Sequence, residues 1–240
     1  MDVELEVDDG VAVITVNRPH SRNAIALDTM EALDKAIDAA AGSGSLVITG
    51  AGDRAFVSGG DLKELAAIRE ESDATAMALR MRGVCDRLAA FPGPVIAALN
   101  GHAFGGGAEV AVAADIRVAA QDVKIGFTQC TLEIIPAWGG AERLAALVGR
   151  GRALLLAGSG RVLDAEQALR FGLVDVVLER PQFEEGWRSL ARSLAGTPAR
   201  EVKRLLAQNA PAEEAARAFA RLWVSEEHWI AAEKVMPRGR

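Results

Sequence analysis

Residues 100–119 read NGHAFGGGAEVAVAADIRVA, and this stretch decides the fold. The apolar run VIAAL (95–99) before it predicts a buried strand, and IRVA (116–119) at its end predicts another. Between the two strands, the residues that follow three glycines are apolar along nearly their whole length, which predicts a buried helix. A strand, a glycine turn, a helix and a second strand in succession indicate a mostly parallel sheet covered by helices.

The same alternation extends towards the N-terminus, whereas the C-terminal third is helical. Strands are predicted over 11–16 and 46–49, and helices over 27–41 and 73–91. From about Gly139 onward the pattern changes, and one strand is predicted over 174–178 among helices over 141–148, 152–157, 164–171, 181–194, 198–209 and 211–232. We expect these helices to cap the α/β core or to pack on a neighbouring subunit.

Composition excludes several classes of protein. The chain has 240 residues, half of them hydrophobic, and a net charge of -6 without a run of Lys and Arg, which argues against a nucleic-acid-binding protein. The acidic N-terminus and the absence of an apolar run long enough to cross a bilayer predict a soluble cytoplasmic protein. Cys85 and Cys130 fit a reducing compartment, and the well-separated His20, His102 and His228 offer no transition-metal site.

The usual nucleotide and hydrolase motifs do not explain the chain. GAGDRA (50–55) mimics a dinucleotide fingerprint, but VSGG (57–60) interrupts the helix that the fingerprint requires. No P-loop, H-E-x-x-H or G-x-S-x-G motif occurs.

Two glycine turns follow predicted strands and precede helices. In AFVSGGDLKE (55–64), Asp61 and Glu64 form the pattern of a capping box, and Gly60 leaves a backbone N–H uncovered. In the second turn, three consecutive glycines have a high conformational entropy, which predicts a special backbone conformation or a close approach by a ligand. Two such turns, each offering one N–H, are what an oxyanion hole requires.

Glu109 is the only ionisable side chain between Ala103 and Ala114. Desolvating an unpaired carboxylate is costly, so the fold must have a reason to accept it. An exposed position on the helix or a buried ion pair is one explanation. A general acid/base, whose pKa is raised by burial, is the other. The residues alone leave both open.

Together these segments resemble the crotonase superfamily, the enoyl-CoA hydratase/isomerase family. The resemblance covers nearly the whole chain and includes NRP (17–19), AFVSGGDLKE, NGHAFGGGAEVAVAADIRVA, IIPAWGGAERL (134–144) and ALRFGLVDVV (168–177). It implies an α/β core (1–185) built as a ClpP-like spiral of ββα units, followed by a helical trimerisation region (186–240). It also implies a homotrimer or a dimer of trimers.

The resemblance assigns roles to particular residues. It implies that the N–H groups of Gly60 and Gly106 hold the thioester oxygen of an acyl-CoA, and that Glu109 is one of the two catalytic glutamates of the hydratases. It places the CoA at Ala24, Gly60, Asp61, Leu62, Lys63 and Gly106. No cofactor, metal, nucleic-acid partner or membrane is implied, since CoA belongs to the substrate.

One departure from the family pattern bears on the reaction. Gln129 stands where the hydratases carry their second glutamate, and Glu133 lies nearby. IIPAWGG, with Trp138, is similar to the corresponding stretch of ethylmalonyl-CoA decarboxylases. We therefore expect Gln129, Glu133 and Trp138 to line the site. We expect an enoyl-CoA hydratase or isomerase of fatty acid metabolism, with an ethylmalonyl- or methylmalonyl-CoA-type decarboxylase and a non-catalytic CoA-ester-binding protein as alternatives.

Overall fold

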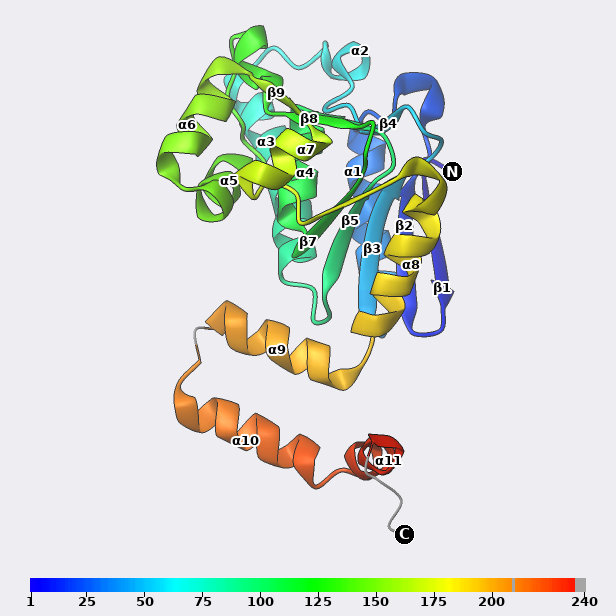
Figure 1. The fold of residues 1–240 in the computed structure, drawn as a ribbon. Coiled ribbons are helices and arrows are strands. Elements are labelled where there is room, and N and C mark those ends of the chain that lie inside the picture. The colour runs from blue at the N-terminus through cyan, green and yellow to red at the C-terminus, as the bar shows by residue number, and fades with distance from the viewer. Residues whose placement is uncertain (209, 236–240) are drawn as a thin grey trace.

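Two β-sheets form the centre of the protein, as seen in a computed structural model that describes residues 1–208 and 210–235 (Figure 1). The larger sheet has the strand order β1-β2-β3-β5-β7-β10, with β1 antiparallel to β2 and the other neighbours parallel. Its strands are Val3–Asp8, Val11–Val16, Ser45–Gly50, Val95–Leu99, Ile116–Ala120 and Val176–Leu178. The smaller sheet has the order β4-β6-β8-β9, with strands Ala55–Val57, His102–Phe104, Lys124–Gly126 and Val162–Asp164.

Three turns of a spiral generate both sheets. Each turn places one strand in the larger sheet and the next in the smaller sheet, and then adds helices: β3 and β4 precede α2 and α3, β5 and β6 precede α4, and β7 and β8 precede α5. These helices are α2 (Leu62–Leu65), α3 (Glu71–Ala89), α4 (Gly106–Ala113) and α5 (Gly140–Val148). The predicted spiral of ββα units is confirmed.

The remaining helices surround this spiral. They are α1 (Leu27–Ala39), α6 (Arg150–Ser159), α7 (Ala165–Phe171), α8 (Phe183–Leu194), α9 (Thr197–Gln208), α10 (Ala212–Trp223), α11 (Glu226–Val235) and the 3-10 turns η1 (Pro19–Ser21), η2 (Thr128–Leu132) and η3 (Arg180–Gln182). No helix among the described residues is both long enough and apolar enough to cross a membrane.

Most of the long elements match the sequence predictions, and the strand predicted over 174–178 is present as β10, but β1 and the strands of the smaller sheet were missed. Residues 11–16 and 95–99 are strands β2 and β5 with the predicted bounds. The strands of the smaller sheet have three residues each, too few to show an alternating pattern, and β9 lies in a segment predicted to be helical apart from residues 174–178.

Two of the predicted C-terminal helices, 198–209 and 211–232, differ from the described structure or extend beyond it. The single helix predicted over 211–232 is two helices, because Val224 ends α10 and the Ser225 hydroxyl accepts a hydrogen bond from His228 N–H in the first turn of α11. Residue 209, the predicted end of the preceding helix, lies outside the described residues.

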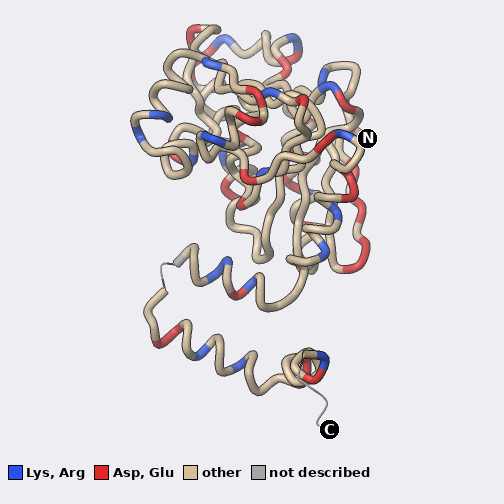
Figure 2. The backbone as a smooth tube through the Cα atoms, in the orientation of Figure 1, with Lys and Arg blue, Asp and Glu red and all other residues tan. Residues whose placement is uncertain are grey.

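Charge is absent from the central strands. Figure 2 shows Lys, Arg, Asp and Glu along the surface loops and helices, while β3 and β5 carry only uncharged residues and are buried along their whole length. Helix α4 is also buried along its whole length, between the sheets and the outer helices. The core therefore holds both sheets and α4 as one body, which positions the residues at the start of α4.

The C-terminal helices leave this core in two stages. Helix α8 packs on the larger sheet with Phe183 and Trp187 buried, so the predicted domain boundary at 185/186 falls inside a helix that contacts the core. Helices α9, α10 and α11 then lie as a layer at one end of the molecule (Figure 1). Several of their large apolar side chains are exposed, namely Val202, Leu206, Phe219, Trp223, Val224, Trp229, Ile230 and Val235.

Gly107, inside the glycine run, allows α4 to touch strand β4. A Cβ at this position would lie 1.8 Å from the carbonyl oxygen of Val57. Because that oxygen belongs to the backbone, only a shift of the helix or the strand could relieve the clash. Tight packing thus explains one of the three glycines.

We expect Gly107→Ala to lower the free energy of unfolding by about 1–3 kcal/mol, because the new methyl group overpacks the α4–β4 contact. Gly83→Ala is the matched control, since Gly83 lies inside α3 and its Cβ would meet no atom within 4 Å. That variant should gain about 0.5–1 kcal/mol from higher helix propensity. Urea unfolding of both variants measures the difference, and equal stabilities would contradict the tight contact.

Candidate active site

Two uncovered backbone N–H groups lie at the ends of neighbouring strands. Gly60 follows β4, and Gly106 follows β6 as the first residue of α4. The residues before them, Gly59 at φ +108° and Gly105 at φ +55°, adopt backbone conformations that favour glycine. A Cβ on Gly59 would lie 3.4 Å from the nitrogen of Gly106, so the two turns adjoin. Among the described residues, nothing accepts a hydrogen bond from either N–H.

The carboxylate of Glu109 lies one helical turn into α4 and is 2% exposed. Its Oε1 accepts a hydrogen bond from Nε2 of Gln129 (2.8 Å), and its Oε2 accepts from the backbone N–H groups of Trp138 (2.7 Å) and Gly140 (2.9 Å). No ion pair involves Glu109 within the described part of the chain. An exposed position on the helix and a buried ion pair are therefore both excluded as explanations for the charge of Glu109.

Burial is the largest influence on the pKa of Glu109, and it raises the pKa. The N–H groups of Gly140 and Trp138 and the Gln129 amide lower it, but they do not cancel the effect of burial. A carboxyl group with a raised pKa is a stronger base when ionised and holds its proton closer to neutral pH. Glu109 is thus suited to accept and return a proton.

The indole of Trp138 forms a wall beside both glycine turns. A Cβ on Gly106 would lie 2.1 Å from its Cζ3 atom, and a Cβ on Gly60 would lie 3.9 Å from its Cζ2 atom. The side chain is almost completely buried. Trp138 therefore keeps water from one side of the two N–H groups, where hydrogen bonds to a developing charge become stronger.

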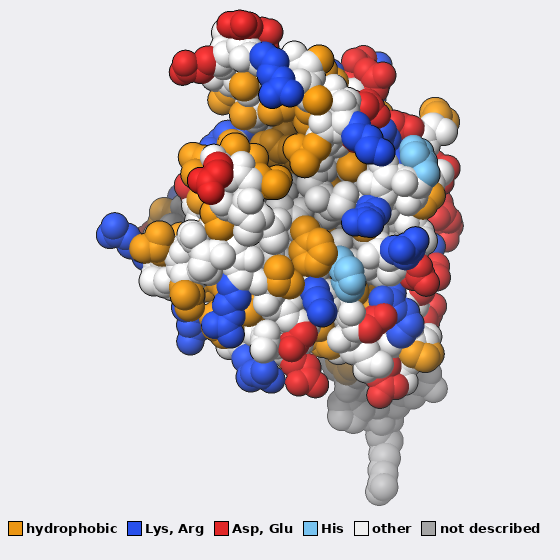
Figure 3. Space-filling view, turned by 90° about the horizontal axis from the view of Figure 1, so that it is seen from above, with side chains coloured by type: hydrophobic (Ala, Val, Ile, Leu, Met, Phe, Trp, Pro, Cys, Tyr) orange, Lys and Arg blue, Asp and Glu red, His pale blue; other side chains and the backbone are white. Residues whose placement is uncertain are grey.

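A mostly apolar pocket of about 530 Å³ joins these groups. Seen from above, the molecule has a hollow with hydrophobic side chains on its walls (Figure 3). The lining includes Leu62, Leu65, Ile68, Met77, Leu132, Ile134 and Ile135 together with Gly60, Gly106, Glu109, Gln129 and Trp138. These apolar residues come from segments 62–82 and 127–138.

Four of the predicted site residues do not line this pocket. Glu133 is exposed in the left-handed conformation that ends η2, so it brings no second carboxylate to Glu109. Lys63 is exposed on α2. Ala24 and Asp61 contact Arg18 instead.

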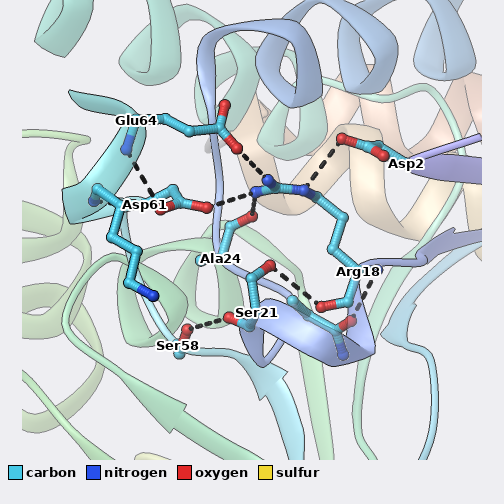
Figure 4. A network of polar contacts seen from close by, with 9 residues as sticks. Asp2, Arg18, Ser21, Ala24, Ser58, Asp61 and Glu64 are labelled. Atoms are coloured by element: carbon cyan, nitrogen blue, oxygen red, sulfur yellow. Dashed lines mark hydrogen bonds and ion pairs between the residues drawn. The ribbon is translucent and has the colours of Figure 1, made fainter.

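The buried side chain of Arg18 is the centre of a polar network that joins buried Asp61 with the partly exposed Asp2 and Glu64 (Figure 4). Its guanidinium donates to the carbonyl oxygen of Ala24 (2.6 Å) and to the carboxylates of Asp61 (3.0 Å), Asp2 (3.0 Å) and Glu64. Asp61 also caps α2 by accepting from the N–H groups of Lys63 and Glu64. The predicted N-cap is present, but the Glu64 carboxylate binds Arg18.

The network reaches Gly60 through the backbone. Asp61 follows Gly60 directly, and its N–H donates to the carbonyl oxygen of Ile25, next to Ala24. Burial raises the pKa of Asp61, but hydrogen bonds from Glu64 N–H and from Arg18 outweigh it and leave the pKa below its ordinary value. Arg18 therefore stabilises the charged form of a residue that positions one N–H donor.

A second pocket of about 480 Å³, the basic pocket, was not predicted from the sequence. Arg22, Arg54, His102 and Arg180 line it together with Asp53 and Asp122, and it shares Ser58 with the apolar pocket. Asp122 forms an ion pair with Arg180. Figure 3 shows Lys, Arg and His side chains gathered on the same face as the hollow. Arg22 and Arg54 form no ion pair with any described residue. The sequence gives no sign of this pocket, because its basic residues are far apart in the chain and only the fold brings them together.

No group of three or more His, Cys, Asp and Glu side chains within residues 1–208 and 210–235 is arranged to hold a metal ion. The polar groups at the apolar pocket are backbone N–H donors, the Glu109 carboxyl group, the Gln129 amide, the hydroxyls of Ser58 and Thr128, and the guanidinium of Arg69. This set suits the stabilisation of an oxyanion and the transfer of a proton.

Known proteins are similar to this chain in sequence and in fold. The profile of the enoyl-CoA hydratase/isomerase family matches residues 6–222. A short-chain-enoyl-CoA hydratase of Clostridium acetobutylicum is 35% identical over 207 residues, which are 84% of this chain and 78% of that protein. A crotonyl-CoA hydratase of Syntrophomonas wolfei is 37% identical over 186 residues, 74% of this chain and 69% of that protein.

The similarity extends to solved structures. The crystal structure of an enoyl-CoA hydratase from Bacillus anthracis superimposes with a TM-score of 0.89 at 30% identity, covering 97% of this chain and 95% of that one. The chain therefore belongs to the enoyl-CoA hydratase/isomerase family and is an enzyme of that family, as the sequence predicted.

We expect Arg18→Met to lower the free energy of unfolding at neutral pH by about 3 kcal/mol, because it leaves the Asp61 carboxylate without its partner. A folded-state pKa below the ordinary value stabilises the protein above the unfolded-state pKa, and this contribution disappears as the pH falls through the folded value. The difference between the two proteins should therefore shrink in acid. Thermal unfolding from pH 7 to pH 3 measures it, and a difference independent of pH would refute the role of Asp61.

Proposed function

We propose that this enzyme isomerises the double bond of an enoyl-CoA through a thioester enolate. In this proposal the N–H groups of Gly60 and Gly106 hold the thioester oxygen, and Glu109 is the single acid/base. One observation supports it above all: the side chain opposite Glu109 is the Gln129 amide, at 2.8 Å, and the described lining of the pocket contains no second carboxylate. An amide cannot exchange protons as a carboxylate does.

Isomerisation needs one proton carrier and no second reactant. Glu109 takes a proton from C2 of a 3-enoyl thioester, and the electron pair of that C–H bond moves into a dienolate. The negative charge on the thioester oxygen is met by the two N–H donors. Glu109 then returns the proton to C4, which gives the 2-enoyl thioester. The raised pKa of Glu109 favours both transfers, because the same group must act as base and then as acid.

Hydration makes a different demand on the site. Addition of water to an enoyl thioester requires one group to activate the water and another to supply a proton to C2, a task ordinarily divided between two carboxylates. Here Gln129 already occupies one side of Glu109 Oε1. The names of the related proteins include hydratases, so hydration is the reaction against which isomerisation should be tested first.

Trp138 favours a second candidate, the decarboxylation of a 2-carboxyacyl-CoA. Its indole lies against both glycine turns, so a carboxylate on C2 of the substrate would lose water beside an apolar surface. Loss of carbon dioxide leaves the electron pair in the same enolate, which the two N–H groups stabilise, and protonated Glu109 donates to C2.

The basic pocket and the C-terminal helices complete the proposal. Arg22 and Arg54, which form no ion pair with the described residues, supply positive charge beside the apolar pocket, which suits the phosphates of CoA.

The exposed apolar faces of α9, α10 and α11 suit contact with further copies of the chain, as a homotrimer or a dimer of trimers. CoA, as part of the substrate, is the only carrier required, and the two free cysteines suit the reducing cytoplasm.

The deciding experiment is a time course with 3-hexenoyl-CoA, crotonyl-CoA and ethylmalonyl-CoA. Mass spectrometry follows gain of water and loss of carbon dioxide, and ultraviolet absorbance follows the conjugated 2-enoyl thioester, which has the same mass as the 3-enoyl thioester. The wild-type enzyme should convert the 3-enoyl ester to the 2-enoyl ester without gain of mass, and Glu109→Gln should reduce turnover about 10²–10⁴-fold. Gain of water on crotonyl-CoA at a comparable rate would identify a hydratase, and loss of carbon dioxide from ethylmalonyl-CoA a decarboxylase.

The Gln129→Glu variant tests in the same experiment whether a second carboxylate permits hydration. If the missing second carboxylate is what prevents hydration, this variant should gain activity on crotonyl-CoA over the wild type. Substantial isomerisation by Glu109→Gln would remove Glu109 from the mechanism altogether.

We expect Arg22→Ala and Arg54→Ala each to raise KM for a CoA ester about tenfold, because each removes a charge-assisted hydrogen bond to phosphate. The kcat should change little, since the reacting atoms are bound elsewhere. The matched control is the N-acetylcysteamine thioester of the same acid, which has no phosphates and should show no change in KM. An equal rise in KM for both thioesters would contradict phosphate binding.

A further inference from the structure

The two oxygens of Glu109 differ in their capacity for further hydrogen bonds. Oε2 accepts from the backbone N–H groups of Trp138 and Gly140, at 2.7 and 2.9 Å, and these donors cannot turn away. Each carboxylate oxygen offers about two lone-pair directions, so Oε2 has none left. Within the described residues Oε1 accepts one hydrogen bond, from Gln129, and the backbone N–H of Ala137 also lies close enough to lower the pKa of the carboxyl group. Any proton that Glu109 gains must therefore bind at Oε1.

The amide of Gln129 is held by this one contact. The residue is 6% exposed, and its Nε2 donates to Glu109 Oε1 at 2.8 Å. Its own Oε1 is buried and has no hydrogen-bond partner among the described residues. A half turn of the amide exchanges its nitrogen and oxygen with almost no change of shape. Either orientation leaves one amide atom unpaired, so the proton on Glu109 decides which atom faces it.

We propose that Gln129 is a positioning residue that follows the protonation state of Glu109 by turning its amide. Nε2 donates to the carboxylate, and after the carboxylate has taken a proton from the substrate, the Gln129 oxygen accepts a hydrogen bond from the new O–H. When the proton returns to the substrate, the amide turns back, so no proton is gained or lost in a cycle. The inference rests on the proposed function, because it requires Glu109 to be both base and acid.

This arrangement suits a single carboxylate better than a fixed donor does. A group that only donates stabilises the anion and opposes uptake of the proton, whereas a group that only accepts does the opposite. An amide that turns has a hydrogen bond to offer in both states, so neither state leaves Glu109 Oε1 without a partner. The absence of a second bond to Gln129 is what leaves the amide free to turn.

Other ionisable groups near Glu109 are accounted for. Elements packed on α4 bring Arg82, Cys85 and Asp86 from α3, His102 from β6, and Glu142 and Arg143 from α5. Cys130 and Glu133 lie in η2 and at its end, near Gln129, and Arg69 lines the pocket with Glu109. Arg82 and Arg143 pair with Glu142 and Asp86. Burial raises the pKa of Cys85 to about 12, so its thiol stays neutral. The contribution of the remaining groups to a pH titration of the enzyme is removed by subtracting the titration of the Glu109→Gln variant.

The test combines kinetics with a direct view of the amide in the full-length enzyme. Exchange of the C2 protons of butyryl-CoA in D₂O measures proton transfer to Glu109 whichever overall reaction is correct. Gln129→Met should lower kcat for exchange about tenfold or more with KM unchanged. The substitution removes the hydrogen bond between Gln129 and Glu109, and this bond affects the proton transfer and not the binding of the substrate. In a Glu109→Gln background the same substitution should have no further effect. Thr131→Val is the control, since Thr131 lies in the same 3-10 turn and its hydroxyl bonds only to Thr128.

Nuclear magnetic resonance of enzyme labelled with ¹⁵N in its glutamine side chains reports whether the Gln129 amide responds to protonation of Glu109. The NH₂ signals of Gln129, assigned by their loss in Gln129→Met, should shift with pH at the midpoint seen in the exchange rate, and should not shift in Glu109→Gln. Signals independent of pH, or wild-type kcat in Gln129→Met, would overturn this inference while leaving the proposed function intact. Rapid exchange by Glu109→Gln would instead overturn the proposed function.

Discussion

The burial of one carboxylate is the constraint on which the site depends. Glu109 lies inside the protein with no ionic partner among the described residues, and three N–H donors replace the water it has lost. Two of these donors are backbone groups from the segment that enters α5. The connection between η2 and α5 must therefore run across the start of α4, and this path also closes the pocket.

Close backbone approach is the second requirement, and the glycines meet it in different ways. Gly59 and Gly105 provide turns with positive φ, while Gly107 and Gly140 admit a strand carbonyl and the Glu109 side chain. At Gly106, the missing Cβ leaves room for the Trp138 ring. A side chain at any of these positions would separate the groups that the spiral brings together.

The electrostatic design differs between the two sides of the pocket. Behind Gly60, Arg18 neutralises Asp61 in a fully paired network, so this charge supports the backbone and takes no part at the pocket surface. Arg22 and Arg54 face the neighbouring basic pocket without such partners. Unpaired cations at a surface pocket attract an anionic ligand, whereas paired ones inside the protein stabilise a conformation.

Local pattern was enough to predict most of the long elements, the N-cap at Asp61 and the two glycine turns, because each depends on residues adjacent in the chain. It also singled out Glu109, a lone charge in an apolar run. It could not reveal the smaller sheet, whose three-residue strands have no period of their own. Nor could it reveal that Gln129 faces Glu109, that Glu133 lies outside the pocket, or that Arg22 and Arg54 line one surface. These facts join residues far apart in sequence, and their distances are set by how the spiral packs.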